Sequence, residues 1–150
     1  MNAPALLADV PSALLLSARV SATLDSTFDA GALVVVVDAT HWGKLALERS
    51  PAGEATIVSV VTRTRSDDCN SFAVTTDGYW LRIAVMPPAV AFHASADGAA
   101  WSLIRHFALG TDAPLRIGLE AQSPLGEGCT ATFSDVALEY RRLAELRDGS

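Results

Sequence analysis

The sequence predicts an all-β protein folded as an antiparallel β-sandwich. Apolar and polar residues alternate in about eight or nine short segments, which are separated by turns rich in Gly, Pro and Asp. The run Ala-Leu-Val-Val-Val-Val at residues 32–37 is typical of a strand buried on both faces. No segment before residue 140 shows the apolar period of a helix. Short antiparallel strands at this spacing fold as two packed sheets.

Length and composition indicate a single domain, residues 1–150, with its core at about residues 14–139. Half of the residues, 50%, are hydrophobic, as expected of a well-packed globular chain. A chain of this size buries a sizeable core without disulfide bonds. Cys69 and Cys129 are therefore expected to be reduced thiols.

The turns set the expected order of the strands. Residues 50–53, Ser-Pro-Ala-Gly, favour a turn, so residues 56–65 should pair antiparallel with residues 42–49. Asp-Gly pairs at residues 77–78 and 97–98 predict two further tight turns. Residues 1–11 are expected to be a loose lead-in, residues 66–70 a polar loop, and residues 140–147 a helix. Besides a short segment at residues 72–75, the predicted strands are residues 14–24, 32–37, 42–49, 56–65, 79–85, 89–95, 101–107, 115–123 and 130–139.

Alternation within each strand predicts which side chains face the core, because strand side chains point to opposite faces in turn. In the strand at residues 56–65, the set Val58, Val60 and Thr62 is expected to face the core. This would place Ser59 and Arg63 beside Lys44 and Glu48. The residues expected to be buried between the sheets are Leu45, Leu47, Val58, Val60, Leu81, Ile83 and Phe133.

Charge and motif content exclude several classes of function. A formal net charge of −6 argues against nucleic acid as a partner, because phosphate binding needs a basic surface. Residues 30–37, the longest apolar run, are far too short to span a bilayer, and no secretory signal is apparent, so we expect no membrane contact and a cytoplasmic location. His41, His93 and His106 lack metal-ligand spacing, and no phosphate loop or nucleophile elbow is present. The prediction is therefore that the protein has no metal and no cofactor.

Six motifs, in order, resemble the family catalogued as domain of unknown function 1349, which is placed with the concanavalin A-like lectin/glucanase jelly rolls. The resemblance covers about residues 14–138. It implies a jelly-roll sandwich and a background of sugar binding, with no established activity. The motifs are Phe28-Asp29-Ala30-Gly31-Ala32-Leu33, Trp42-Gly43-Lys44-Leu45-Ala46-Leu47-Glu48, Val60-Val61-Thr62-Arg63, Trp80-Leu81-Arg82-Ile83, Ser95-Ala96-Asp97-Gly98-Ala99-Ala100-Trp101 and Gly118-Leu119-Glu120-Ala121-Gln122-Ser123-Pro124.

The chain departs from the family pattern at two places. Ala30 stands where members commonly carry Gln, which removes one amide from the expected binding face. The resemblance also implies that an N-terminal segment common in the family is lacking, which would leave a sheet edge open for pairing with a second copy. A homodimer is therefore expected.

The candidate site is a polar and aromatic patch on the concave face of one sheet. Tryptophans can stack on sugar rings while charged side chains bind hydroxyl groups. In the opposing interpretation, Lys44, Glu48 and Arg63 form a solvated ion-pair ladder, and the tryptophans pack structurally. The predicted ligand-binding residues are Trp42, Lys44, Glu48, Ser59, Arg63, Trp80, Arg82 and His93.

Three functions follow from this patch, in order of preference. The first is a non-catalytic, lectin-like module for a carbohydrate or related polyhydroxylated ligand. The second is a protein-interaction or regulatory module, and the third is a weak glycoside hydrolase. Glu48 and Glu120 are the only strand carboxylates that could share a face, and no pair of acids stands two or four residues apart on one strand, so no catalytic residue is assigned.

Overall fold

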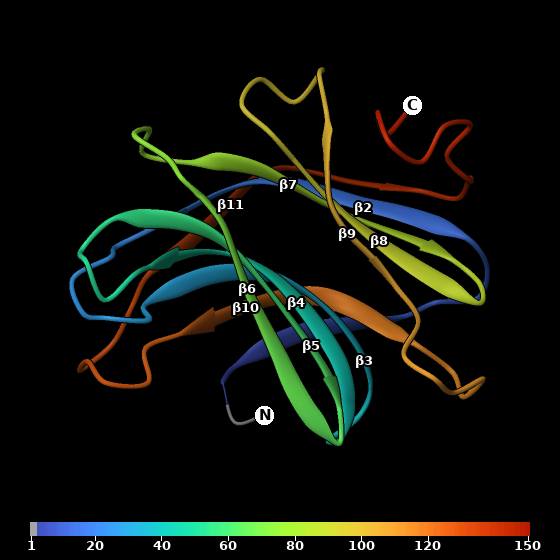
Figure 1. The fold of residues 1–150 in the computed structure, drawn as a ribbon, viewed down its shortest axis with the longest axis horizontal. Coiled ribbons are helices and arrows are strands. Elements are labelled where there is room, and N and C mark those ends of the chain that lie inside the picture. Colours follow the sequence, from blue (N-terminus) through green and yellow to red (C-terminus); the bar gives the residue numbers. More distant parts are fainter. Residues whose placement is uncertain (1–2) are drawn as a thin grey trace.

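The computed structural model describes residues 3–150 as two antiparallel sheets packed face to face (Figure 1). The predicted antiparallel sandwich is confirmed, and it is of the jelly-roll type. The strands are β1 (Ala5–Asp9), β2 (Leu14–Ala22), β3 (Ala30–Asp38), β4 (His41–Arg49), β5 (Ala55–Arg63), β6 (Arg65–Ala73), β7 (Tyr79–Met86), β8 (Ala89–Ser95), β9 (Ser102–Phe107), β10 (Arg116–Gln122) and β11 (Ala131–Glu139).

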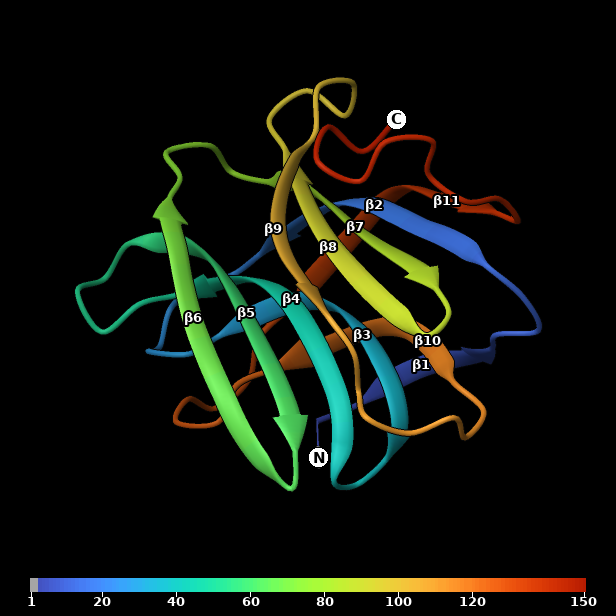
Figure 2. The same ribbon diagram turned by 45° about the vertical axis from the view of Figure 1, so that its right-hand side comes forward.

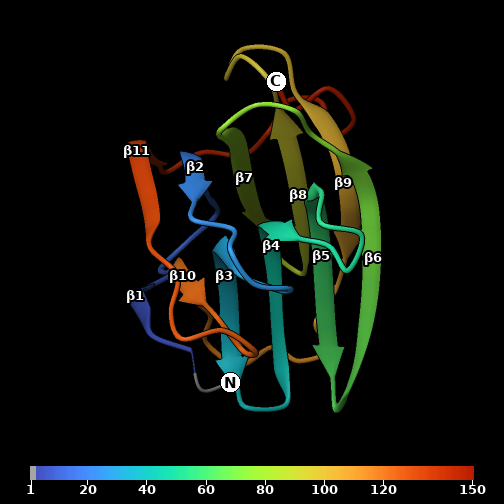
Figure 3. The same ribbon diagram turned by 90° about the vertical axis from the view of Figure 1, so that its left-hand side faces the viewer.

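One sheet has six strands in the order β1-β10-β3-β4-β5-β6, and the other has five in the order β11-β2-β7-β8-β9. Figure 2 shows the two layers, and Figure 3 shows β3, β4, β5 and β6 side by side. The predicted antiparallel pairing of residues 42–49 with residues 56–65 is confirmed by β4 and β5, since Trp42 lies opposite Thr62 and Glu48 opposite Thr56. The strand β7 belongs to the five-stranded sheet, so Trp80 and Arg82 lie in a different sheet from Trp42 and Lys44.

The core lies between the sheets and is almost wholly aliphatic. Alternate residues of the valine-rich strand β3 face it, and the intervening ones are buried on the opposite side of the same sheet. Phe92 and Phe107 pack edge to face, with ring centroids 4.8 Å apart and an interplanar angle of 67°. Both cysteines are free thiols, as predicted. The core includes Leu16, Leu33, Val35, Leu45, Leu47, Ile57, Val61, Leu81, Ile83 and Phe92, and Phe133 packs against it partly buried.

The expected core face of β5 is wrong. Register places Ser59 opposite Leu45, so Ser59 shares the core face and is 0% exposed. Val58 and Val60 are also buried, but they lie on the outer face of the sheet, beside Ala46 and Lys44. The error arose because both alternating sets of this strand are largely apolar, so that only pairing with β4 decides between them.

Two segments expected to be irregular are strands. Residues 5–9, placed in the loose lead-in, form β1 and pair with β10, and residues 66–70, expected as a loop, belong to the edge strand β6. Because β1 covers the edge of β10, the open edge that motivated the homodimer is absent there. The fit requires Gly118, because a Cβ at that position would lie 1.8 Å from the carbonyl oxygen of Leu6.

The helix predicted over residues 140–147 is absent, and the structure has no helix among residues 3–150. Residues 141–150, which we call the closing segment, follow an irregular path across the outer face of the five-stranded sheet (Figures 1 and 2). Leu143 and Leu146 pack there against Leu15, Ala84 and Ala91. Their three-residue spacing imitates a helical period, but tertiary contact, not helix formation, buries them. Over the described residues no helix suits a membrane crossing.

Candidate functional site

The outer face of the six-stranded sheet carries a groove of about 430 Å³. Four strands and the loops beside β3 and β10 line it, and it combines aromatic, charged and amide side chains. Trp42 lies in the same cross-strand row as Thr62 and Ser66, while Phe28 precedes the start of β3. The groove is lined by Phe28, Trp42, Lys44, Glu48, Val58, Val60, Ser66, Asp68, Asn70, Gln122 and Pro124.

Three alanines lie together on this outer face. Ala30, Ala32 and Ala46 cluster on adjacent strands and are each 0% exposed. Register places Ala30 between Gln122 of β10 and Glu48 of β4. Because an alanine projects only a methyl group, the longer side chains on either side can meet above it.

Gln122 joins the polar groups of the groove. Its Oε1 accepts a hydrogen bond from Nζ of Lys44, and its Nε2 donates to Oε2 of Glu48 at 3.1 Å. The same Nε2 donates to the carbonyl oxygen of Phe28 at 2.8 Å. Lys44, Gln122 and Glu48 thus form one hydrogen-bonded chain whose side chains are held in fixed orientations.

Glu48 is 8% exposed. Burial raises the pKa of its carboxyl group; Lys44 opposes this rise, Asp68 adds to it, and the Gln122 hydrogen bond opposes it. A buried carboxylate between one cation and one amide donor is a directional acceptor for a ligand hydroxyl group.

Phe28 forms part of the groove wall in an unfavourable backbone conformation. Its φ is 68°, in the left-handed region that bulky side chains rarely adopt, and the residue is 37% exposed. Its amide donates to the carbonyl oxygen of Arg49 at 2.9 Å, and the next residue, Asp29, accepts from the amide of Ser26 at 2.8 Å. An exposed aromatic ring held in a strained backbone is a feature associated with function.

The structure brings together only part of the predicted site. Trp42, Lys44 and Glu48 line the groove together. Ser59 faces the core, and its hydroxyl has no hydrogen-bond partner. Arg63 lies at the end of β5 and pairs with Asp67 at 3.0 Å rather than with Glu48. The ion-pair ladder of the opposing interpretation is therefore not formed, because Lys44 bonds to Gln122 and Arg63 lies on the other face.

The expectation that Trp80, Arg82 and His93 share that face is wrong. They belong to β7 and β8, and they lie on the outer face of the five-stranded sheet, on the opposite side of the molecule. Trp80 lies under the turn at Gly98, where an added Cβ would come within 2.8 Å of its ring. Arg82 is 7% exposed and His93 is 0% exposed, both beneath the closing segment.

Sequence reasoning missed several residues of the groove. Phe28 and Gln122 stand inside motifs that carried the family resemblance, yet neither was given a role. Asp68 and Asn70 were hidden because their segment was interpreted as a loop, whereas on β6 they alternate toward the groove. In the strand at 115–123, period-2 alternation alone would have placed Glu120 and Gln122 on one face.

Glu120 lies on the groove side of β10, opposite Ala32, and is 4% exposed with one carboxylate oxygen unpartnered. Burial raises the pKa of this carboxyl group, and Lys44 opposes the rise. Because the pKa of Glu120 is higher in the folded state than in the unfolded state, its protonated carboxyl group favours folding. This contribution to the free energy of unfolding is fully present below the unfolded-state pKa and is lost as pH rises through the folded-state pKa.

Glu120→Gln, which cannot ionise, is therefore expected to raise the melting temperature at pH 8 by about 2–4 °C. The gain should disappear below about pH 4, where the native carboxyl group is protonated. Thermal melts from pH 4 to 8 would check this, with the exposed Glu127→Gln as the control. A gain that does not depend on pH would contradict the burial argument.

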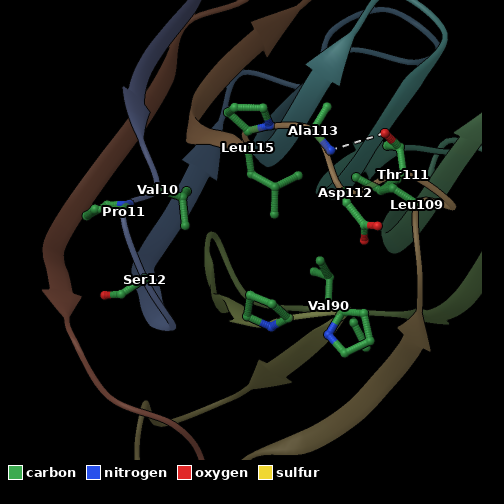
Figure 4. A pocket seen from close by; sticks show the side chains of 13 residues that line it. Val10, Pro11, Ser12, Val90, Leu109, Thr111, Asp112, Ala113 and Leu115 are labelled. Carbon is green, nitrogen blue, oxygen red and sulfur yellow. Dashed lines mark hydrogen bonds between the residues drawn. The ribbon is translucent and has the colours of Figure 1, made fainter.

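A second cavity, of about 350 Å³, lies at one end of the sandwich (Figure 4). None of the predicted site residues lines it. The amide of Ala113 donates to Oγ1 of Thr111 at 3.2 Å, and Asp112 is the only charged lining residue. Prolines and aliphatic side chains supply most of its other walls, which offers few directional groups to a ligand. Elsewhere among residues 3–150, no cluster of three His, Cys, Asp or Glu side chains could hold a metal ion.

Comparison with known proteins places these features in a family. A curated relative, Regulation of enolase protein 1 of Saccharomyces cerevisiae, is 30% identical over 128 residues, which are 85% of this chain and 64% of that protein. The chain thus spans less than two thirds of that relative. The solved structure of a functionally unknown protein from Saccharomyces cerevisiae is 28% identical, with a TM-score of 0.80, over 91% of this chain and 73% of that one.

The fold is also found in proteins of other kinds. The carbohydrate-binding module CBM66 of Bacillus subtilis matches with a TM-score of 0.60 and 13% identity, over 88% of this chain and 77% of that one. At that identity the likeness concerns the fold alone. The family model described as protein of unknown function DUF1349 matches residues 1–141. The chain therefore belongs to the DUF1349 family.

Proposed function

We propose that the groove on the six-stranded sheet binds a neutral carbohydrate, or a related polyhydroxylated ligand, without changing it chemically. The observation that carries this proposal is the hydrogen-bonded chain Lys44–Gln122–Glu48 above the cluster of alanines. A sugar ring needs donors and acceptors at fixed positions beside a flat apolar surface, and this arrangement supplies both. The fold shared with CBM66 is consistent with such a role.

Aromatic side chains supply the stacking surfaces. Trp42 and Phe28 both line the groove, and Trp42 is half-buried while Phe28 is exposed. Rings that are already held in place lose little conformational entropy when a ligand stacks on them.

The charges of the groove favour a neutral ligand over an acidic one. Glu48 and Asp68 carry two negative charges against the single positive charge of Lys44. A carboxylate or phosphate on the ligand would meet this negative excess, and like charges brought together in a partly buried site repel. Uronic acids and sugar phosphates should therefore bind more weakly than their neutral counterparts.

Calorimetric titration of the full chain with neutral oligosaccharides, each matched to a uronic-acid counterpart, tests this proposal. Gln122→Ala should weaken binding by about tenfold, because it leaves Glu48 without its amide donor and Lys44 without its acceptor. Thr111→Ala, in the end cavity, is the control and should leave binding unchanged. Recovery of the ligand uncleaved would separate binding from weak hydrolysis.

The second candidate is a protein-interaction or regulatory role, which the name of the yeast relative favours. Under this alternative the groove would receive a side chain or loop of a partner protein. If no oligosaccharide of either series binds while the protein remains folded, the regulatory role becomes the preferred one.

A further inference from the structure

The closing segment covers the outer face of the five-stranded sheet without joining it. Within residues 3–150, its main-chain hydrogen bonds stay inside the segment, as from the amides of Ala144 and Glu145 to the carbonyl of Ser150, except for one from the amide of Arg141 to the carbonyl of Glu139. Contact with the sheet is made by Leu143 and Leu146 and by two side-chain hydrogen bonds. The segment can therefore leave without breaking any strand ladder.

Arg82 and His93 bind main-chain carbonyls of this segment. Nη1 of Arg82 donates to the carbonyl oxygen of Gly149 at 2.7 Å, and Nε2 of His93 lies 2.7 Å from that of Leu146. The guanidinium of Arg82 also lies 3.7 Å from the ring centroid of Trp101. Hydrogen bonds to main-chain carbonyl groups depend on the backbone conformation of a bound peptide and not on the identity of its side chains.

Both groups keep unused hydrogen-bonding capacity although they are more than nine-tenths buried. Nε of Arg82 and Nδ1 of His93 have no partner. A buried cation with no carboxylate partner is costly to a fold that gains nothing from it. Such a cost is understandable where the groups serve to bind a ligand.

Gly149 occupies a slot that admits no side chain. An added Cβ would lie 2.9 Å from Cβ of Trp101 and 3.3 Å from both Nη1 of Arg82 and Cδ2 of His93. The φ of Gly149 is 73°, which glycine alone adopts without strain. Together with the leucines, the slot defines a pattern of Leu, Leu and Gly at intervals of three residues.

We propose that the outer face of the five-stranded sheet is a peptide-binding site that the closing segment occupies as a displaceable ligand. The site accepts a peptide with the Leu-x-x-Leu-x-x-Gly pattern of residues 143–149, presented by the same chain or added separately. The family match ends at residue 141, so the segment that fills the site lies outside the matched region. The site is on the opposite side of the molecule from the groove and is independent of the function proposed for it.

Gly149→Ala in the full chain tests whether the slot retains the segment. The substitution combines strain with a clash, and the released segment should be cut by trypsin after Arg142 and Arg147 about tenfold faster than in the native chain. Gly110→Ala is the matched control, since its φ of 76° imposes similar strain while no atom lies within 4 Å of the added Cβ. Circular dichroism should show the same β content in all three proteins.

Binding of an added peptide decides whether the face is a site or merely a packing surface. A labelled peptide of residues 141–150 should bind Gly149→Ala but neither the native chain nor Gly110→Ala, in which the tethered segment competes at high effective concentration. The same peptide with alanine for Gly149 should bind none of them. Unchanged cleavage of Gly149→Ala, or cleavage without selective peptide binding, would overturn the proposal. If Gly149→Ala does not fold, Leu146→Ser should release the segment and expose the same site.

Discussion

Gly118→Ala is expected to detach β1 from the six-stranded sheet and to lower the free energy of unfolding by about 3 kcal/mol. The added Cβ would lie 1.8 Å from the carbonyl oxygen of Leu6 and 2.8 Å from its carbonyl carbon. These are main-chain atoms of a strand paired with β10, so they cannot move aside without losing the ladder. Urea denaturation followed by tryptophan fluorescence would measure the change.

Gly43→Ala provides a comparison within the same sheet. Its added Cβ would lie 3.0–3.3 Å from ring atoms of Phe92 and Phe107, which can shift slightly. We expect it to cost less than Gly118→Ala. Equal losses would show that the close approach of β1 carries no special weight.

Release of β1 should also change association. The unpaired edge of β10 would present free amides and carbonyls, which attract strands of other molecules. Sedimentation at micromolar concentration should therefore show more self-association for Gly118→Ala than for the native chain. The comparison tests whether an open sheet edge causes self-association, because β1 covers the edge of β10 in the native chain and should leave it open in Gly118→Ala.

Trp42→Ala and Trp80→Ala are expected to have opposite effects. Trp42 lines the groove, so its loss should weaken binding of a neutral oligosaccharide by about 1–3 kcal/mol and change stability little. Trp80 packs beneath the turn at Gly98, so its loss should lower the free energy of unfolding by about 3 kcal/mol and leave binding intact.

Melting temperatures and calorimetric titrations of both variants would check this pair, each serving as the control for the other. A large drop in the melting temperature of Trp42→Ala would assign that ring to packing and remove a stacking surface from the groove. If Trp80→Ala weakened sugar binding in a protein of normal stability, the assignment of the two tryptophans to opposite sides of the molecule would be contradicted.

Part of the candidate site could be predicted from the alternation of apolar and polar residues along each strand. Period-2 alternation placed Trp42, Lys44 and Glu48 on one face and Leu45 and Leu47 on the other, because successive strand side chains must point to opposite faces. It also separated Trp80 and Arg82 from Leu81 and Ile83 correctly. Each strand was thus divided properly when its two sets differed in polarity.

Alternation could not say to which sheet a strand belongs. The strands β4 and β7 carry the same pattern of an aromatic followed two residues later by a cation, and the sequence-based interpretation placed both on one concave face. In the sandwich they lie in different sheets, so their polar faces point in opposite directions. Alternation shows which residues of a strand share a face, but it does not show which strands lie beside that strand in the fold.

By itself, the sequence determined the all-β sandwich, most of the strands and the antiparallel pairing of residues 42–49 with the following strand, since these follow from local turn chemistry and side-chain period. Membership in the family was indicated by the six motifs and their order. Tertiary structure alone decided the face of Ser59, the docking of β1, the hydrogen bonds of Gln122 and the position of the closing segment. Each of these depends on register or contact between segments far apart in the chain. Such choices are made by packing between strands, which no local pattern contains.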